Sequence, residues 1–290
     1  MITGRHTGGA APTVGVVTIV AGRLVALSNL LIGLRRQVLP ADRVVVVRMD
    51  GRTAGVAAGD GLPLVHAAVE VRADGALPLA AARNAGVRAC GAVDVVVFLD
   101  VDCIPGSQLV ATYGRLAAAE DALVTGVVGY LPAGVPGTGP WTERQLARSA
   151  QPHPARPVVA AGMVERDRRH ELAWTTSLAL ARSHFESLGG FDERFVGYGA
   201  EDTDFALRAA FAGLHVAWTG DAPAYHQHHG REGLPVEHVD DIVRNATLFH
   251  ELHGWFPMNG WLHQFATLGL VEFVPGCGRL RRLEASSSVR

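Results

Sequence analysis

The chain contains 290 residues, with a formal net charge of −2, 48% hydrophobic residues and 19% charged residues. This composition is typical of a globular protein and excludes a disordered or collagen-like chain. The near-neutral charge offers no basic footprint for nucleic acid, and the absence of lysine excludes a lysine Schiff base and a P-loop.

The three cysteines lie far apart in the chain, without metal-ligand spacing and without an even set that would form disulfides. The apolar run at 14–20 is too short for a secretory signal, and no run approaches the ~20 residues that span a bilayer. We therefore expect buried or incidental thiols, no transmembrane segment and a cytoplasmic location.

Strand and helix signals alternate through the first half of the chain. The apolar run at 14–20 predicts a buried strand, and leucines at helical spacing follow until Pro40 ends the helix. Consecutive valines predict a second strand that is buried on both faces. We expect this second strand at 43–49, a loop at 51–64, a weaker strand at 64–71, a helix at 79–89 and a strand at 92–99. The alternation predicts a mostly parallel sheet flanked by helices.

The second half is less regular. Residues 131–170 are rich in Pro, Gly and Arg and predict an irregular excursion. Ser183 and Glu186 have the spacing of a capping box, and the short helix that they begin ends at Gly189. We also expect helices at 201–212, 239–253 and 260–271, a late strand at 215–218 and a frayed tail after Pro275.

Two carboxylates follow the strand at 92–99. Asp100 and Asp102 are spaced i, i+2 and precede Pro105. Ligands of open α/β sheets bind beyond the carboxyl ends of strands, where these two side chains project. Because neighbouring carboxylates repel each other, a divalent cation beside them is favoured, and it would bridge to a diphosphate. The structural alternative is a pair of turn-forming aspartates that cap the next helix.

Three carboxylates, Glu201, Asp202 and Asp204, begin a predicted helix behind a glycine-rich loop with aromatic residues. The helix dipole accounts for one or two of them. A general base for an alcohol is a carboxylate or histidine without a tight ion-pair partner, and Asp202 is our candidate. We expect Glu201 to hydrogen-bond the acceptor hydroxyls and Asp204 to be a structural cap.

Two further patterns suggest ligand binding. His226 and His229 are spaced i, i+3 and could face one ion, since imidazole suits Mn²⁺, Zn²⁺ and other transition ions. His228 could replace His229, and a solvent-exposed histidine cluster is the alternative. Arg83 lies among alanines in a predicted helix, where small residues allow close approach and a guanidinium binds anions. A surface arginine on a packed helix is the alternative.

With these motifs in this order, the sequence resembles GT-A glycosyltransferases of family 2 over about residues 13–229. Its carboxy-terminal half resembles the β-1,4-galactosyltransferase type. The resemblance implies an α/β, Rossmann-like GT-A fold with a mostly parallel central sheet and a helical C-terminal extension. It implies one domain over 1–270, divided into a nucleotide-sugar-binding half (13–105) and an acceptor-binding and catalytic half (106–270), before a tail at 271–290.

The resemblance assigns the donor contacts. Thr18 and Asp50 fall where base and ribose contacts occur, and Arg83 falls where the Ala-Arg-Asn segment approaches the nucleotide. Asp100 matches the carboxylate nearer the ribose and sugar, and Tyr198 stands where a tryptophan that packs on sugars is common. The first strand departs from the usual Pro-x-Tyr-Asn run, and the second departs from Asp-Asp-Gly-Ser.

The resemblance also assigns the metal ligands and the catalytic residues. Asp102 matches the carboxylate that holds the metal directly, His229 a histidine ligand and His226 a methionine ligand. Asp202 matches the catalytic base, and Glu201 its acceptor-binding neighbour.

The function implied is inverting, metal-dependent transfer of a sugar from a nucleoside-diphosphate sugar, by resemblance a UDP-sugar, to an acceptor hydroxyl. The metal would be Mn²⁺ or Mg²⁺, and the acceptor a glycan, a lipid or a natural product. A homodimer is left open. The alternatives are a metal-dependent nucleotide-sugar hydrolase, a non-catalytic sugar-binding module and a sugar nucleotidyltransferase. Product analysis with and without an acceptor separates transferase from hydrolase.

Overall fold

The computed structural model describes residues 10–51, 61–230 and 233–283. At the centre of the sheet, β1 (Val14–Val20) lies parallel to both β2 (Arg43–Arg48) and β4 (Val95–Leu99). All seven residues of β1 and all five of β4 are buried, as continuous apolar runs require when helices cover both faces. β3 (Leu64–Ala68) extends this group in parallel. The predicted strands of the first half are confirmed, with shifted ends.

The rest of the sheet is mixed, which corrects the expectation of a mostly parallel sheet. β9 (Ser177–Ala181) runs antiparallel to both β4 and β6 (Ala122–Tyr130). β10 (His215–His226) is parallel to β6 but antiparallel to β5 (Cys103–Pro105). Among the described residues the sheet has ten strands in the order β3-β2-β1-β4-β9-β6-β10-β5, with β7 (Gln151–Pro152) on β6 and β8 (Val164–Asp167) on β10.

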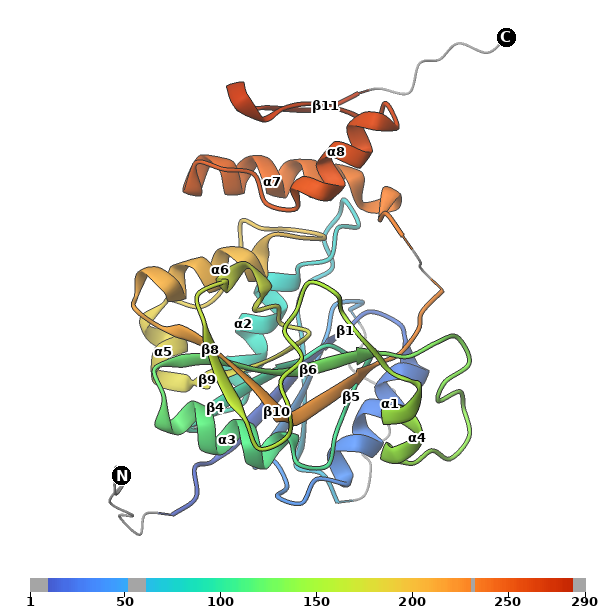
Figure 1. Ribbon diagram of the computed structural model, residues 1–290, viewed down its shortest axis with the longest axis vertical. Helices are drawn as coiled ribbons and strands as arrows, with labels where there is room; N and C mark the ends of the chain where they lie inside the picture. The colour runs from blue at the N-terminus through green and yellow to red at the C-terminus, as the bar shows by residue number, and fades with distance from the viewer. Residues whose placement is uncertain (1–9, 52–60, 231–232, 284–290) are drawn as a thin grey trace.

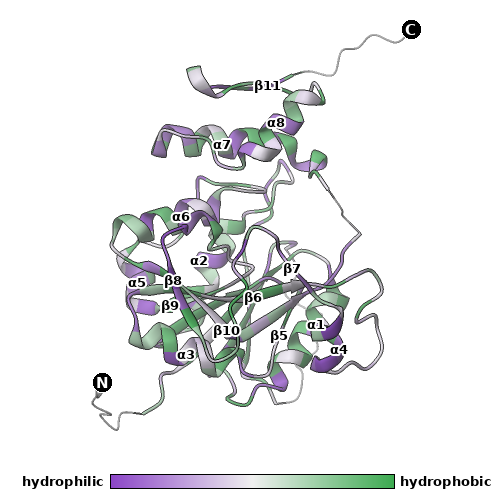
Figure 2. Cartoon of the chain, viewed as in Figure 1, coloured by the Kyte–Doolittle hydropathy of each residue, from purple (hydrophilic) through white to green (hydrophobic). Residues whose placement is uncertain are grey.

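Helices cover both faces of this sheet (Figure 1), and apolar residues concentrate in its strands (Figure 2). Alternate residues of β1 point to opposite faces of the sheet, so that Val16 packs in one apolar core and Val17 in the other. One face is covered by α1 (Leu24–Arg35) and α3 (Leu109–Ala119), and the other by α2 (Leu79–Ala89), α5 (Arg182–Ser187) and α6 (Glu201–Phe211). The result is a three-layer α/β/α body.

Two local predictions in the second half are wrong. The capping box at Ser183 does not form, because α5 begins after Ala181 without a side-chain cap and Glu186 accepts a hydrogen bond from Arg182 instead. A capping box instead begins α4 (Glu143–Ser149), where Thr142 is the cap. The second wrong prediction is the irregular excursion at 131–170, since this segment contains α4, β7 and β8. The predicted loop at 51–64 lies mostly outside the described residues.

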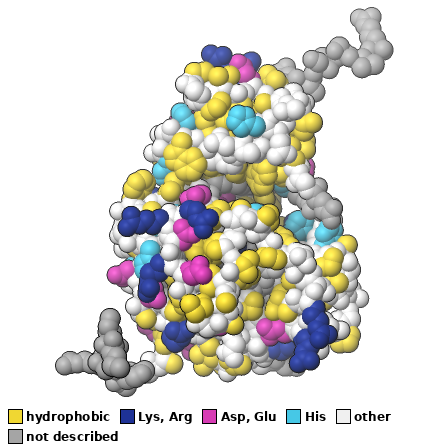
Figure 3. Space-filling view, viewed as in Figure 1, with side chains coloured by type: hydrophobic (Ala, Val, Ile, Leu, Met, Phe, Trp, Pro, Cys, Tyr) yellow, Lys and Arg dark blue, Asp and Glu magenta, His cyan; other side chains and the backbone are white. Residues whose placement is uncertain are grey.

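Residues 233–283, the C-terminal module, form a separate layer above α6 (Figure 1). The module has its own apolar cluster, in which Ile242, Leu262 and Phe265 are fully buried. Figure 3 shows a hollow between the module and the body, with histidine side chains at its edge. Its elements are η2 (Val236–His238), α7 (Val239–His253), α8 (Asn259–Thr267), β11 (Val271–Val274), η3 (Pro275–Cys277) and β12 (Arg279–Arg282).

The end of the described chain differs from expectation. α8 ends at Thr267, and the tail expected to be frayed is ordered as far as β12, since β11 and β12 pair as an antiparallel hairpin. Across the hairpin, Glu272 of β11 pairs with Arg279 and Arg281 of β12. No helix among the described residues is both long enough and apolar enough to cross a bilayer.

Candidate active site

The site lies at the carboxyl edge of the sheet, where the strand order reverses between β1 and β4. Open α/β sheets bind ligands in the crevice at such points. Asp100 and Asp102 occupy the turn between β4 and β5. The end of β10 runs beside that turn, because His226 pairs with Cys103 of β5 and the Gln227 N–H donates to the Asp102 carbonyl at 2.7 Å. The fold therefore joins the acidic and histidine motifs.

Asp102, His226 and His229 offer ligand atoms that all lie within 4.8 Å of one another. His226 Nε2 is 3.5 Å from Asp102 Oδ1, and His229 Nε2 is 3.9 Å from Asp102 Oδ2. Asp102 is 4% exposed, and its Oδ1 accepts no hydrogen bond from the described residues. A buried carboxylate oxygen without a donor is costly unless a cation or water satisfies it. This donor set fits Mn²⁺ and similar ions.

The two imidazoles are held differently. His226 stacks on Tyr130 of β6, with ring centroids 4.7 Å apart. Burial, with the charge of Arg23, lowers the pKa of His229, so that its ring is neutral near pH 7. A neutral imidazole is the form that binds a metal ion. Among the described residues the cluster includes His229 and not His228.

Sequence reasoning missed Arg23. This residue ends the β1–α1 loop with a left-handed backbone (φ 49°), and its Nη1 forms an ion pair with Asp102 Oδ2. The guanidinium therefore supplies a positive charge to the same carboxylate that faces the two histidines. The available signal was a basic residue in the loop after the first strand, where nucleotide contacts were expected.

Arg83 joins the acidic segments. Its guanidinium donates to Glu201 Oε1 at 2.8 Å and to Asp100 Oδ1 at 3.4 Å. Burial alone would lower the pKa of Arg83, but the charges of Glu201, Asp100 and Asp202 outweigh it and the pKa lies above its ordinary value. Burial raises the pKa of Asp100, against the attraction of Arg83. Arg83 is therefore a buried ion-pair partner, and the alternative of a surface arginine is wrong.

Asp202 lies in the first turn of α6, after Ala200 with a left-handed backbone (φ 74°). Its Oδ1 accepts a hydrogen bond from the Thr203 N–H at 2.8 Å. Burial, followed by the charge of Glu201, raises the pKa of Asp202 to about 7. A carboxylate with a pKa near the working pH is suited to accept a proton.

The remaining predicted donor contacts, Thr18, Asp50 and Tyr198, lie on three different segments of the chain. Thr18 lies within β1, 1% exposed, and its Oγ1 has no hydrogen-bond partner among the described residues. Asp50 follows β2 and is held by Arg48, with Nη2 and Oδ2 2.6 Å apart. Tyr198 stacks on His238 of the C-terminal module, with centroids 4.8 Å apart. Burial, with the charge of Asp202, raises the pKa of Tyr198.

Comparison with known proteins gives one sequence match and several structural ones. A family model described as the N-terminal domain of galactosyltransferase matches residues 157–230, which include Asp202, His226 and His229. No curated protein sequence matches the chain.

Solved structures share the fold at low identity. One is GalNAc-T7 with UDP, GalNAc and Mn²⁺, at 13% identity and a TM-score of 0.55, covering 89% of this chain and 57% of that one. Another is Staphylococcus aureus TarS, solved as residues 1–349, at 13% identity and a TM-score of 0.55, covering 82% of this chain and 64% of that one. This chain thus spans less than two thirds of either structure.

The fold is that of the GT-A glycosyltransferases, an α/β body around a mixed sheet. The sequence match to the galactosyltransferase domain over residues 157–230 points to a glycosyltransferase, and the structural neighbours support the fold.

Proposed function

We propose that this protein is an inverting, metal-dependent glycosyltransferase of family 2. It moves a sugar from a nucleoside-diphosphate sugar, a UDP-sugar in the first instance, to the hydroxyl of a glycan, lipid or natural product. The observation that carries this proposal is the cluster of Asp102, His226 and His229. Arg83 links this region to the proposed base, because it pairs with Asp100 and with Glu201, the neighbour of Asp202. We assign the donor to residues 13–105 and the acceptor and catalysis to residues 106–270 of one domain.

Asp102, His226 and His229 are the proposed ligands of the divalent ion, Mn²⁺ or Mg²⁺. Three features support this assignment: the unsatisfied Oδ1 of Asp102, the neutral ring of His229 and the closeness of the ligand atoms. When bound, the ion neutralises the charge that the departing nucleoside diphosphate gains. Arg23 can add a guanidinium to the same diphosphate, since guanidinium pairs well with phosphate oxygens.

The other donor contacts are proposed from the positions of the residues in the fold. We assign the base and ribose contacts to Asp50, which follows β2, whereas Thr18, assigned to the same contacts, is 1% exposed within β1. Asp100, held by Arg83, faces the ribose and sugar. Tyr198 offers a ring for the sugar to pack against.

Asp202 is the proposed general base. It takes the proton of the acceptor hydroxyl while that oxygen attacks the anomeric carbon and the bond to the diphosphate breaks. The transition state has oxocarbenium character, as in glycoside hydrolysis. Glu201 is held through Oε1 by Arg83, and its Oε2 has no hydrogen-bond partner among the described residues. That free oxygen can accept a hydrogen bond from the acceptor.

Product analysis tests the proposal. The protein is incubated with Mn²⁺, UDP-sugars and a panel of hydroxyl acceptors, and both UDP and the glycoside are measured. We expect UDP release that requires an acceptor, a product of inverted anomeric configuration, and a loss of about 10²–10⁴-fold in Asp202→Asn. Acceptor-independent release of free sugar would instead establish a hydrolase, and binding without turnover a sugar-binding module.

A further inference from the structure

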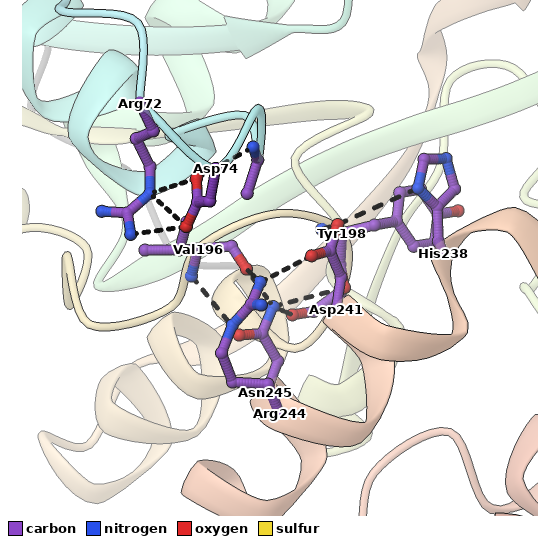
Figure 4. A network of polar contacts seen from close by, with 10 residues as sticks. Arg72, Asp74, Val196, Tyr198, His238, Asp241, Arg244 and Asn245 are labelled. Carbon is purple, nitrogen blue, oxygen red and sulfur yellow. Dashed lines mark hydrogen bonds and ion pairs between the residues drawn. The ribbon is translucent and has the colours of Figure 1, made fainter. Parts of the chain in front are cut away.

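Helix α7 of the C-terminal module lies against the loop that leads to Asp202 (Figure 4). Asn245, in the middle of α7, is 0% exposed. Its Nδ2 donates to the carbonyl oxygens of Val196 at 3.0 Å and Gly199 at 2.9 Å, and to that of Tyr198 at 3.3 Å. Its Oδ1 accepts from the Val196 N–H at 3.3 Å. One side chain of α7 therefore makes four hydrogen bonds to the backbone of the 196–199 loop.

A second residue of α7 holds the same loop. Asp241 accepts a hydrogen bond from the Tyr198 N–H at 3.1 Å and pairs with Arg244 Nη2 at 2.6 Å. Gly197 has φ +76°, and a Cβ at this position would lie 2.2 Å from the Asp241 carboxylate. The loop and α7 are thus in closer contact than any side chain at this position would allow.

α7 also contacts α6, the helix that carries Asp202. His253, in the last turn of α7, lies 2.9 Å from Asp204 Oδ1, and the two side chains are 8% and 2% exposed. Asp204 also accepts from Arg208 Nε at 2.9 Å. Helix α7 consequently holds the chain on both sides of Asp202.

We infer that α7 positions the proposed catalytic base, and that Asn245 is the positioning residue. An apolar residue at 245 would extend the module's own apolar cluster, whereas a buried amide is costly unless its hydrogen bonds form. Those bonds fix backbone that leads within three residues to Asp202. Because displacement of a catalytic group by about 1 Å can cost about 10²-fold in rate, this restraint bears directly on turnover. The inference rests on the proposed function only in the role given to Asp202.

The test uses the full chain with Asn245→Ala. We expect hydrogen exchange of the amides of 196–200 to rise by about tenfold or more, because the loop loses its four hydrogen bonds to Asn245. We expect kcat for transfer to fall by about 10²-fold. The Kd for UDP with Mn²⁺, which depends on Asp102 and the histidines in the proposed function, should stay within about twofold, since the hydrogen bonds of Asn245 go to 196–199.

Val271→Ala is the matched control, because Val271 is 2% exposed in the same module and packs in its apolar cluster. It should lower stability while leaving loop exchange and kcat unchanged. Equal losses in both variants, or wild-type exchange and kcat in Asn245→Ala, would overturn the inference. Should Asn245→Ala not fold, Asp241→Ala is judged by the same readouts. If wild type binds no UDP with Mn²⁺ and transfers no sugar, the proposed function fails, and loop exchange still decides whether α7 holds the loop.

Discussion

Asp102 is the residue on which the charges of the site converge. Its carboxylate faces two imidazoles and is paired with the Arg23 guanidinium. A guanidinium and a divalent ion on one carboxylate repel each other, and a local dielectric below that of water strengthens the repulsion. Arg23 is therefore an internal counterion of Asp102. A metal ion that binds Asp102 must displace Arg23 or share the carboxylate with it.

Replacing Arg23 by Gln should tighten Mn²⁺ binding in the absence of nucleotide. Removal of the competing positive charge is expected to lower the Kd for Mn²⁺ by about tenfold, equivalent to ~1.4 kcal/mol. Titration followed by electron paramagnetic resonance measures this Kd. Arg35→Gln on the exposed surface of α1 changes net charge equally and should have little effect. Unchanged or weaker Mn²⁺ binding in Arg23→Gln would show that the ion pair does not compete with the metal.

Asp202 makes stability depend on pH in a defined direction. Its pKa of about 7 in the folded chain lies above its unfolded value, so the folded state binds the extra proton between about pH 4 and pH 7. The stability associated with this proton is present at low pH and is lost as pH rises through about 7. Asp202→Asn, which cannot ionise, should therefore gain Tm relative to wild type as pH increases.

The expected gain is on the order of 5 °C at pH 8 and near zero at pH 4. Thermal unfolding across this pH range measures the difference. A Tm difference that is constant with pH would mean that the carboxyl keeps an ordinary pKa.

At the level of secondary structure, the loop at 196–199 depends on Gly197. Gly197→Ala adds a left-handed strain and places a methyl group 2.2 Å from Asp241. Gly213→Ala is the matched control, because Gly213 also has a positive φ (+89°) but its Cβ would meet nothing within 4 Å. We expect the Tm of Gly197→Ala to fall several degrees below that of Gly213→Ala. Equal Tm values would show that the loop can move away from α7 at little cost.

The strands and the site residues differ in how far the sequence predicts them. Consecutive valines located β2 and β4, but β9 was not predicted, because its short segment of alternating leucine and alanine contains no run of β-branched residues. Asp100 and Asp102 were found because they follow β4. Arg23 was missed because its only signal, a place in the loop after the first strand, belongs to no motif, and Asn245 was missed because its partners lie about 50 residues away in sequence.

The whole molecule is a sheet-centred body with the C-terminal module as a further layer above α6 (Figure 1). The body supplies the proposed metal ligands and base, and the module supplies Asn245 and Asp241, which hold the loop before Asp202. The proposed site therefore depends on both the body and the C-terminal module.

The most direct measurement is thermal stability with UDP alone, with Mn²⁺ alone and with both, on wild type and on Asp102→Asn. A ligand that binds only the folded state raises the Tm. We predict a large rise that requires UDP and Mn²⁺ together and is absent in Asp102→Asn. An equal rise in the variant, or no rise with UDP, GDP or dTDP in the presence of metal, would contradict a metal-dependent nucleotide-sugar site at Asp102.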